Sequence, residues 1–216
     1  MKKHTKKTTL INFILDKSGS MEIISNDVIG GFNRYLKDLQ KRDEKVLFTL
    51  TVFDTFHKRI CTALDIKKVE PLSEKNYSPT GSTALYDAAV DSIEAIAEEV
   101  KKMEIKPAVL TVVMTDGEEN ASAKHDQGCF RELVGKLEKE DWTFVYLGAN
   151  QDSWANASQS GLTRGNVADW ASSAVGVRSA FSDLSLNSVA YVASASAGDN
   201  MQVKNFMSLA IDKKIK

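Results

Sequence analysis

The residue pattern with the clearest chemical meaning is Asp16-x-Ser18-x-Ser20, which directly follows an apolar run at 10–15. Carboxylate and hydroxyl oxygens are hard ligands, which suit Mg²⁺, Mn²⁺ or Ca²⁺ better than zinc or copper. The carboxyl end of a buried strand is where α/β proteins usually keep their sites. The pattern therefore predicts an oxygen-ligand metal site. Taken alone, the same residues also fit a turn with a helix N-cap and no metal.

Two more oxygen-bearing residues follow features of the same kind. Thr83 ends a stretch dense in turn-forming residues at 77–83, and Asp116 comes just after a continuous apolar run at 108–114. The carboxyl ends of parallel strands point to one side of a sheet, so Asp16 and Asp116 should face one crevice. Two neighbouring carboxylates repel unless a cation lies between them. The spacing therefore favours the metal site over the helix cap.

Hydrophobic periodicity predicts the elements that position these residues. Runs of apolar and β-branched residues predict strands, and apolar residues at helical spacing predict helices. The second and third strands should form an antiparallel hairpin at a sheet edge. The predicted fold class is α/β, with a doubly wound, mostly parallel central sheet, helices on both faces and one antiparallel edge strand. The expected strands are 8–15, 46–53, 57–64, 108–114, 142–147 and 166–170, and the expected helices are 21–41, 84–103, 128–139, 152–160 and 172–186.

The chain should contain a single domain with two appendages. Residues 1–7 are a basic tail, residues 8–186 are the domain, and residues 187–216 are a tail that is partly disordered or docks on the domain. Within the first helix, Gly30-Gly31 is unfavourable for helix formation and fits a helix backbone lying close to a sheet. Ser82 or Thr83 is placed to cap the helix that follows.

Bulk composition excludes several classes of function. The chain has 216 residues, 43% of them hydrophobic, and a formal net charge of −1, so nothing draws it to nucleic acid or an anionic membrane. No apolar stretch is as long as a membrane span, and the start has no signal-peptide pattern. Cys61 and Cys129 are far apart, without metal-ligand spacing, and are expected to be structural thiols. These features predict a cytoplasmic protein.

The sequence motifs support an enzymatic function less well than a metal-binding site. A haloacid-dehalogenase-like phosphatase needs a second carboxylate two residues after its nucleophile, where this chain has Ser18. The phosphate-binding glycine motifs of nucleotide-binding proteins and the G-x-S-x-G elbow of serine hydrolases are absent. One enzymatic hypothesis stays open: a Mg²⁺-dependent hydrolase of phosphatase type, in which Asp16 and Asp116 hold the ion and activate water.

The motif as a whole resembles the metal-ion-dependent adhesion site (MIDAS) of von Willebrand factor type A (VWA) domains. The resemblance rests on Asp16-x-Ser18-x-Ser20, Thr83 after a glycine, and Thr115-Asp116-Gly117. It implies a divalent cation, usually Mg²⁺, held directly by Ser18 and Ser20. Thr83 would bind directly or through water, and Asp16 and Asp116 mostly through waters and hydrogen bonds to the hydroxyls. A carboxylate from a partner protein would complete the octahedron.

The resemblance also indicates a setting. The segments 27–33, 83–88 and 148–152 resemble those of small bacterial and phage intracellular members, which implies a component of a multiprotein complex. Glu118, Glu119 and Asp126 form either a solvated acidic rim or a surface that favours basic neighbours of the docking acid. We expect the rim that a partner contacts to comprise Met21, Gly81, Ser82, Gly117, Glu118 and Asn150.

Overall fold

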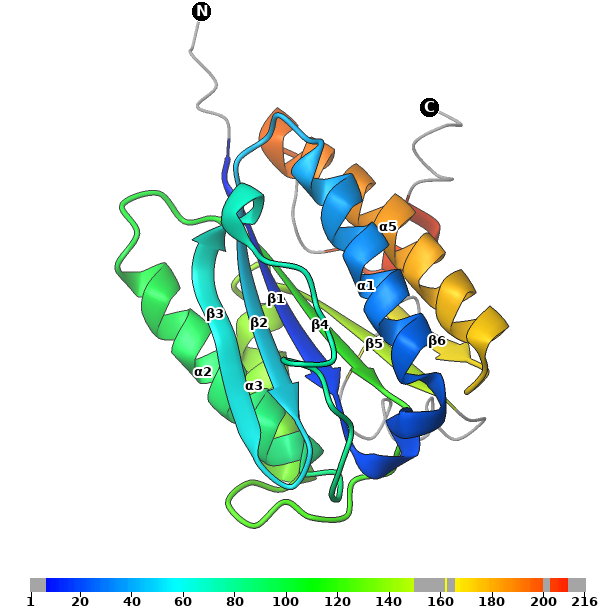
Figure 1. Ribbon diagram of the computed structural model, residues 1–216. Coiled ribbons are helices and arrows are strands. Elements are labelled where there is room, and N and C mark those ends of the chain that lie inside the picture. Colours follow the sequence, from blue (N-terminus) through cyan, green and yellow to red (C-terminus); the bar gives the residue numbers. More distant parts are fainter. Residues whose placement is uncertain (1–6, 150–161, 163–165, 200–202, 210–216) are drawn as a thin grey trace, which may run out of the picture.

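The computed structural model describes residues 7–149, 162, 166–199 and 203–209 (Figure 1). Six strands of this part of the chain form one sheet in the order β3-β2-β1-β4-β5-β6. Only the edge strand β3 is antiparallel to its neighbour, which confirms the predicted fold class. The strands are β1 (Thr9–Asp16), β2 (Val46–Phe53), β3 (His57–Asp65), β4 (Ala108–Thr115), β5 (Thr143–Ala149) and β6 (Val167–Trp170).

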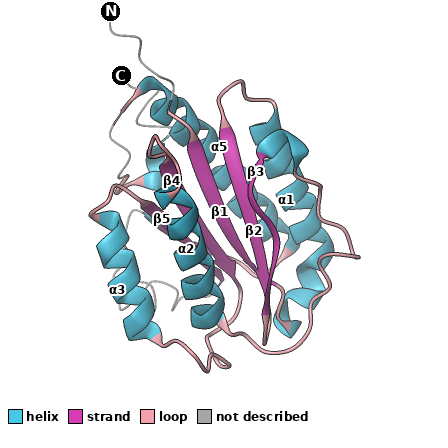
Figure 2. Cartoon of the chain, turned by 90° about the vertical axis from the view of Figure 1, so that its left-hand side faces the viewer, coloured by secondary structure: helices cyan, strands magenta, loops and turns pink. Residues whose placement is uncertain are grey.

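Helices cover both faces of the sheet. Figures 1 and 2 show α1 and α5 on one face and α2 and α3 on the other. The helix expected over 152–160 lies outside the described residues. Where the chain is described, no helix is long and apolar enough to cross a membrane. The helices are α1 (Ser25–Gln40), α2 (Leu85–Lys101), α3 (Gln127–Glu138) and α5 (Ala174–Ala197), with short 3-10 helices η1 (Gly19–Ile24), η2 (Ile66–Lys68) and η4 (Phe206–Ser208).

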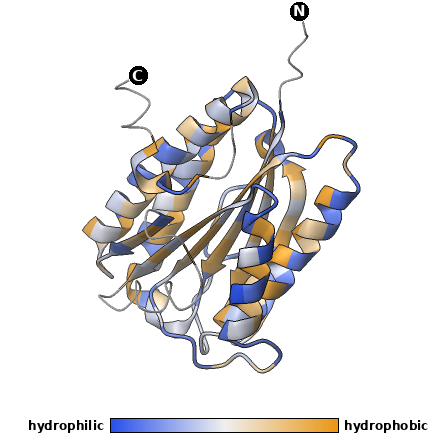
Figure 3. Cartoon of the chain, turned by 180° about the vertical axis from the view of Figure 1, so that it is seen from behind, coloured by the Kyte–Doolittle hydropathy of each residue, from blue (hydrophilic) through white to orange (hydrophobic). Residues whose placement is uncertain are grey.

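The central strands are mostly apolar because both of their faces are covered (Figure 3). Every residue of β1 is buried. Ile11, Phe13 and Leu15 pack in the core that includes α1 and α5, whereas Leu10 and Ile14 pack in the core that includes α2 and α3. This alternation anchors β1 from both sides and fixes where its carboxyl end lies.

The paired glycines of α1 have different surroundings. A Cβ added to Gly31 would lie 2.3 Å from Cδ2 of Phe181, a buried side chain of α5, whereas a Cβ on Gly30 would meet nothing within 4 Å. The prediction that this pair brings the helix close to a sheet is corrected, because the close neighbour is another helix. Gly31 therefore permits tight packing of α1 against α5.

The last helix is longer than the sequence predicts. The helix expected over 172–186 continues to Ala197 and ends at Gly198, which has a φ of +87°. Tyr191 and Val192 are fully buried, and the Tyr191 hydroxyl donates a hydrogen bond of 2.9 Å to the carbonyl of Val109 in β4. The tail expected from residue 187 is thus corrected over 187–197, which belong to the domain core.

The segment 203–209 lies against the same core. Phe206 is fully buried, with its ring centroid 6.2 Å from that of Tyr191. The Asn166 side chain donates to the carbonyl of Val203 (2.6 Å) and accepts from the backbone N–H of Phe206 (2.9 Å). These contacts fasten the segment next to the start of β6.

Gly31→Ala should destabilise the protein, and Gly30→Ala should not. The methyl group at position 31 would overlap the Phe181 ring, at a cost of roughly 1–3 kcal/mol, whereas alanine at position 30 should gain up to about 1 kcal/mol of helix propensity. Urea unfolding of both variants and the wild type measures the difference. Equal stability of Gly31→Ala and the wild type would show that α1 and α5 are not packed this closely.

Candidate metal centre

The register of β1 and β4 brings the first aspartate to the end of the second strand. Leu15 pairs with Met114, so Asp16 lies beside Thr115 where the two strands end. The Thr115 hydroxyl donates a hydrogen bond of 2.5 Å to Oδ2 of Asp16. Asp116 directly follows Thr115, the last residue of β4, and therefore lies in the same crevice as Asp16.

The two serines join Asp16 to Asp116. The backbone N–H of Ser18 donates to Oδ1 of Asp16 at 2.6 Å, which closes a tight turn after β1. The Oγ atoms of Ser18 and Ser20 lie 3.2 Å apart, and the Ser20 hydroxyl donates to Oδ1 of Asp116 at 2.5 Å. A continuous chain of hydrogen bonds thus links both aspartates through the turn.

The segment that carries Thr83 is held against this turn by backbone hydrogen bonds. Gly19 donates its N–H to the carbonyl of Gly81 (3.1 Å). Thr83 is also clasped by Asn120 of the β4–α3 loop: its N–H donates to Oδ1 of Asn120 (2.9 Å), and its carbonyl accepts from the Asn120 N–H (3.0 Å). Because its backbone is fixed on both sides, the Thr83 side chain has a defined position.

The three hydroxyls meet beside Gly117. A Cβ built on this glycine would lie 3.0 Å from Oγ1 of Thr83, 3.6 Å from Oγ of Ser20 and 3.8 Å from Oγ of Ser18. The space that a side chain would occupy is therefore ringed by hydroxyl oxygens, with the Asp116 carboxylate next to it. The fold thus brings together all five predicted metal ligands, and their hard oxygens suit a divalent cation such as Mg²⁺ or Mn²⁺.

Burial sets the electrostatics of this crevice. The pKa of Asp16 is raised to about 6, mainly because burial disfavours its charged form. Hydrogen bonds from Thr115 and Ser18 partly oppose that rise, and the nearby charge of Asp116 adds to it. The Tyr77 hydroxyl donates to the Asp16 carbonyl at 2.8 Å, and its pKa is also raised, by burial and by the two aspartates. A cation in the crevice would offset the cost of this buried negative charge.

Histidine side chains, which are common metal ligands, lie together with an aspartate elsewhere in the structure. His125 and His57 both face Asp91 of α2, with Nε2–oxygen distances of 3.1 and 3.6 Å. Throughout the described ranges, no group of three or more His, Cys, Asp or Glu side chains is arranged to hold a metal. A metal in the crevice would thus depend on hydroxyl ligands, as the sequence predicts.

The predicted rim divides into exposed, buried and undescribed residues. Gly81, Ser82 and Glu118 are exposed, and Gly117 is half-buried. Met21 is fully buried in the core beneath η1, because the 3-10 turn directs its side chain inward, so its assignment to the rim is wrong. Asn150 lies outside the described residues.

Two residues support the site in ways that the sequence did not predict: Thr115, which was named only as part of the motif, and Ser172. Thr115 holds Asp16, and the Ser172 hydroxyl, just before α5, donates to Oδ2 of Asp116 at 3.2 Å. The role of Thr115 could have been predicted from its position between an apolar strand and the predicted ligand Asp116. The role of Ser172 could not have been predicted, because it lies 56 residues from its partner in a serine-rich stretch.

The cap of α2 also comes from a distant segment. The structure places Ala84 at the N-cap position with no side-chain cap, which corrects the expectation that Ser82 or Thr83 caps this helix. Instead, Glu119 accepts from the N–H of Tyr86 (3.1 Å), and Ser122 accepts from the next N–H along the helix (3.1 Å). Because Glu119 caps α2, it is not part of a solvated acidic rim.

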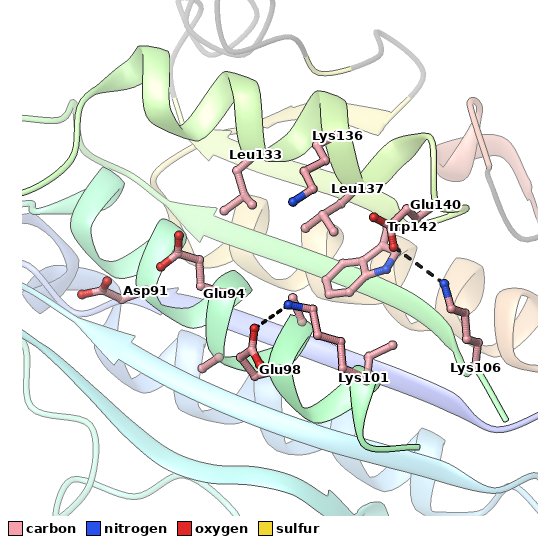
Figure 4. A pocket seen from close by; sticks show the side chains of 13 residues that line it. Asp91, Glu94, Glu98, Lys101, Lys106, Leu133, Lys136, Leu137, Glu140 and Trp142 are labelled. Carbon is pink, nitrogen blue, oxygen red and sulfur yellow. Dashed lines mark hydrogen bonds and ion pairs between the residues drawn. The ribbon is translucent and has the colours of Figure 1, made fainter. Parts of the chain in front are cut away.

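A groove of about 510 Å³ lies between α2 and α3, away from this crevice (Figure 4). Trp142 and Leu137 form part of its apolar floor. Lys101 pairs with Glu98 across 2.6 Å, and Lys106 lies 3.8 Å from Glu140. These ion pairs are exposed and none of the lining residues approaches the hydroxyl cluster, so the groove has no part in the candidate metal centre.

The fold has many solved counterparts, although no family model and no curated protein sequence matches the chain. Proximal thread matrix protein 1 (PTMP1) from the mussel byssus, solved with a zinc-occupied MIDAS motif, has a TM-score of 0.59 at 19% identity. The alignment covers 83% of this chain and 45% of PTMP1. Manganese-loaded TRAP protein from Plasmodium vivax has a TM-score of 0.54 at 18% identity, covering 82% of this chain and 74% of that one.

A protein described as von Willebrand factor type A, from Catenulispora acidiphila, is similar in the same way. Its TM-score is 0.57 at 12% identity, and the match covers 85% of this chain and 43% of that protein. The chain therefore spans less than half the length of PTMP1 and of the Catenulispora protein. These likenesses show that the chain has the VWA fold.

Asp16→Asn should change stability in a pH-dependent way in the metal-free protein. The folded-state pKa of about 6 exceeds the unfolded value of about 3.9. The folded state therefore binds the extra proton between these values, and the stability contribution of Asp16 falls as pH rises through this window. Above pH 6, removing the buried charge should stabilise the protein by roughly 1–3 kcal/mol, and the gain should vanish near pH 4.

Urea unfolding in EDTA from pH 4 to pH 8 measures this effect. Added Mg²⁺ should stabilise the wild type and leave Asp16→Asn unchanged, because the amide is a poor substitute for the carboxylate. If Asp16→Asn were less stable than the wild type at pH 7.5 in EDTA, the prediction would be wrong. The hydrogen bonds to the Asp16 carboxylate would then stabilise the protein by more than the burial of its charge costs.

Gly117→Ala should weaken metal binding while leaving the fold intact. The new methyl group would press on Oγ1 of Thr83 and fill the space that the hydroxyls surround. Affinity for Mg²⁺, measured by titration calorimetry, should fall about tenfold or more. Gly135→Ala is the matched control, since a Cβ on this α3 residue meets nothing within 4 Å. Unchanged affinity in Gly117→Ala would place the metal elsewhere.

Proposed function

We propose that this VWA-fold domain is a metal-dependent protein-binding module that docks a partner's Asp or Glu carboxylate on a bound Mg²⁺. The observation that carries the proposal is the meeting of three hydroxyls beside Gly117, with the carboxylates of Asp16 and Asp116 behind them. A metal ion held by neutral hydroxyls and partly shielded carboxylates would keep most of its charge, so it would favour an external acid as a further ligand.

Each side chain has a distinct part in this proposal. Ser18, Ser20 and Thr83 would offer oxygen lone pairs, and Ser20 can do so because its proton points to Asp116. Asp16 is engaged by the Thr115 hydroxyl and the Ser18 N–H, so it would act mainly through hydrogen bonds. A divalent cation held by neutral hydroxyls keeps most of its positive charge and would supply the attraction for a partner's carboxylate.

We propose binding and not catalysis because we find no matched nucleophile and base among the described residues of the crevice. Two histidines lie in the described part of the chain, His57 and His125, and both are paired with Asp91 of α2. Ser18 and Ser20 contact each other, Ser20 donates to Asp116, and no imidazole or amine of the described residues is recorded in a hydrogen bond with either serine side chain. A hydrolase would have to use a metal-activated water alone.

The comparisons support a divalent metal at this position. The zinc-occupied MIDAS motif is a property of PTMP1, and the manganese is a property of the TRAP protein. We propose Mg²⁺ here because it tolerates weak hydroxyl ligands and retains replaceable waters. We further propose a bacterial or phage complex in the cytoplasm as the setting. The motif resemblance supports the origin, and the free thiols of Cys61 and Cys129 support a reducing compartment.

Ser18→Ala tests the proposed site. The variant should bind Mg²⁺ about tenfold or more weakly than the wild type. It should also lose proteins that the wild type captures in Mg²⁺ and releases in EDTA. Ser179→Ala is the matched control, because Ser179 is exposed on α5, away from the crevice. An acid-to-amide change in a captured partner should abolish its retention.

Two results would contradict the proposal. Capture that persists in EDTA and in Ser18→Ala would show that proteins bind elsewhere on the domain. Mg²⁺-dependent turnover of a phosphate ester, abolished by Asp116→Ala, would instead favour the hydrolase hypothesis.

A further inference from the structure

Large apolar side chains are exposed around the candidate metal centre. The described residues include five such side chains, and three of them directly follow segments that build the site. The five are Ile23 (95% exposed), Phe56 (79%), Val175 (69%), Ile105 (62%) and Leu186 (49%). Single exposed apolar residues are ordinary on protein surfaces, so the informative feature is that three of them, Ile23, Phe56 and Val175, lie on segments at the end of the sheet that holds the crevice.

Ile23 lies one turn beyond the first ligands. It belongs to η1, three residues after Ser20, whose hydroxyl contacts Asp116. Its neighbours Met21 and Ile24 are buried in the core, which leaves Ile23 on the outer side of the turn. The burial of these neighbours holds Ile23 in place at the edge of the crevice.

Phe56 is fixed on the β2–β3 turn. Its N–H donates to Oδ1 of Asp54 at 2.8 Å, and its carbonyl accepts from the Asp54 N–H at 2.8 Å. The preceding residue, Thr55, accepts a hydrogen bond of 2.9 Å from the N–H of Ser82. The turn is therefore tied to the segment that carries Thr83, and Phe56 projects beside that segment into solvent.

Val175 lies on the opposite flank. It is in the first turn of α5, three residues after Ser172, which donates to Asp116. The Ser173 side chain caps this turn by accepting from the N–H of Gly176 at 3.2 Å. Figure 1 shows η1, the β2–β3 turn and the start of α5 at the same end of the molecule, where the parallel strands end.

Two exposed acids belong to the segments that carry the ligands, and the exposed base Lys58 follows the β2–β3 turn. Glu22 and Glu118 are exposed, whereas the ammonium group of Lys17 is paired with Asp54. Two exposed carboxylates would repel a partner segment that carries a run of acids. A single acid can be accommodated by the metal, and its neighbours would then meet apolar side chains.

We infer that the partner offers one isolated carboxylate flanked by large apolar side chains, which pack on Ile23, Phe56 and Val175. This inference rests on the proposed function, because the metal must receive the carboxylate. The metal would supply the attraction, and the three apolar side chains would select the sequence around the acid. The occupant is a protein segment of this composition.

A library of short random peptides displayed on phage tests the inference. The full chain is immobilised, peptides are selected in millimolar Mg²⁺, and those retained are eluted with EDTA. Enriched peptides should share one Asp or Glu with a large apolar residue close to it on at least one side. For a synthetic peptide of the enriched sequence, Phe56→Ser should lower affinity about tenfold or more.

Two controls separate the apolar contacts from the metal. Phe56→Ser should bind Mg²⁺ as tightly as the wild type by titration calorimetry, because its side chain does not touch the ligands. Ile105→Ser, which removes an exposed apolar side chain from the connection between α2 and β4, should bind the peptide like the wild type.

The remaining outcomes overturn the inference in distinguishable ways. Acidic peptides that elute with EDTA but show no apolar preference and ignore Phe56→Ser would refute it and leave the proposed function standing. Apolar peptides that stay bound in EDTA would show that the apolar surface acts without the metal. If Mg²⁺ binds and no EDTA-sensitive peptide is enriched, both the proposed function and this inference fail.

Discussion

The structure depends on keeping two acidic side chains close together at the end of a buried parallel sheet. The register of β1 and β4 forces Asp16 and Asp116 into one crevice, and burial makes the charge on Asp16 unfavourable. Hydroxyl groups reduce this cost: Thr115 donates to Asp16, and Ser20 donates to Asp116. These donors satisfy the carboxylates without neutralising them. Residual negative charge in a partly enclosed space is what attracts and retains a divalent cation.

The loops around the crevice share a second constraint, because each must hold a site residue and also complete another element. The β4–α3 loop clasps Thr83 through Asn120 and caps α2 through Glu119. The β2–β3 turn binds Ser82 through Thr55, while its Asp54 pairs with Lys17, the residue after Asp16. The site is therefore fixed by side chains that are already required by the secondary structure, and few residues serve the metal centre alone.

Most of the fold, and the meeting of the five oxygen-bearing residues in one crevice, could be predicted from the sequence, because the strands and the residues at their ends follow local patterns. Continuous apolar runs identify strands covered on both faces, and the strands end where the predicted ligands begin. The errors concern contacts between distant segments. The extension of α5 past residue 186 is hidden because its last turns are rich in Ser and Ala and are buried on several sides, so they lack an amphipathic pattern. Ser172 and the cap of α2 could not be found by spacing, since their partners are far away in the chain.

The identity of residue 18 is our reason for not proposing a haloacid-dehalogenase-like phosphatase. A carboxylate at this position would make the crevice more acidic, lower the effective charge of a bound ion and supply the second acid that such a phosphatase needs beside its nucleophile. Serine supplies no second carboxylate, and its hydroxyl is already in contact with Ser20. The two described histidines that could serve as bases are committed to Asp91 in the cluster between β3, α2 and the β4–α3 loop. Under the proposed function, an ion in such surroundings would have few negative ligands, and a carboxylate from another protein would supply a further one.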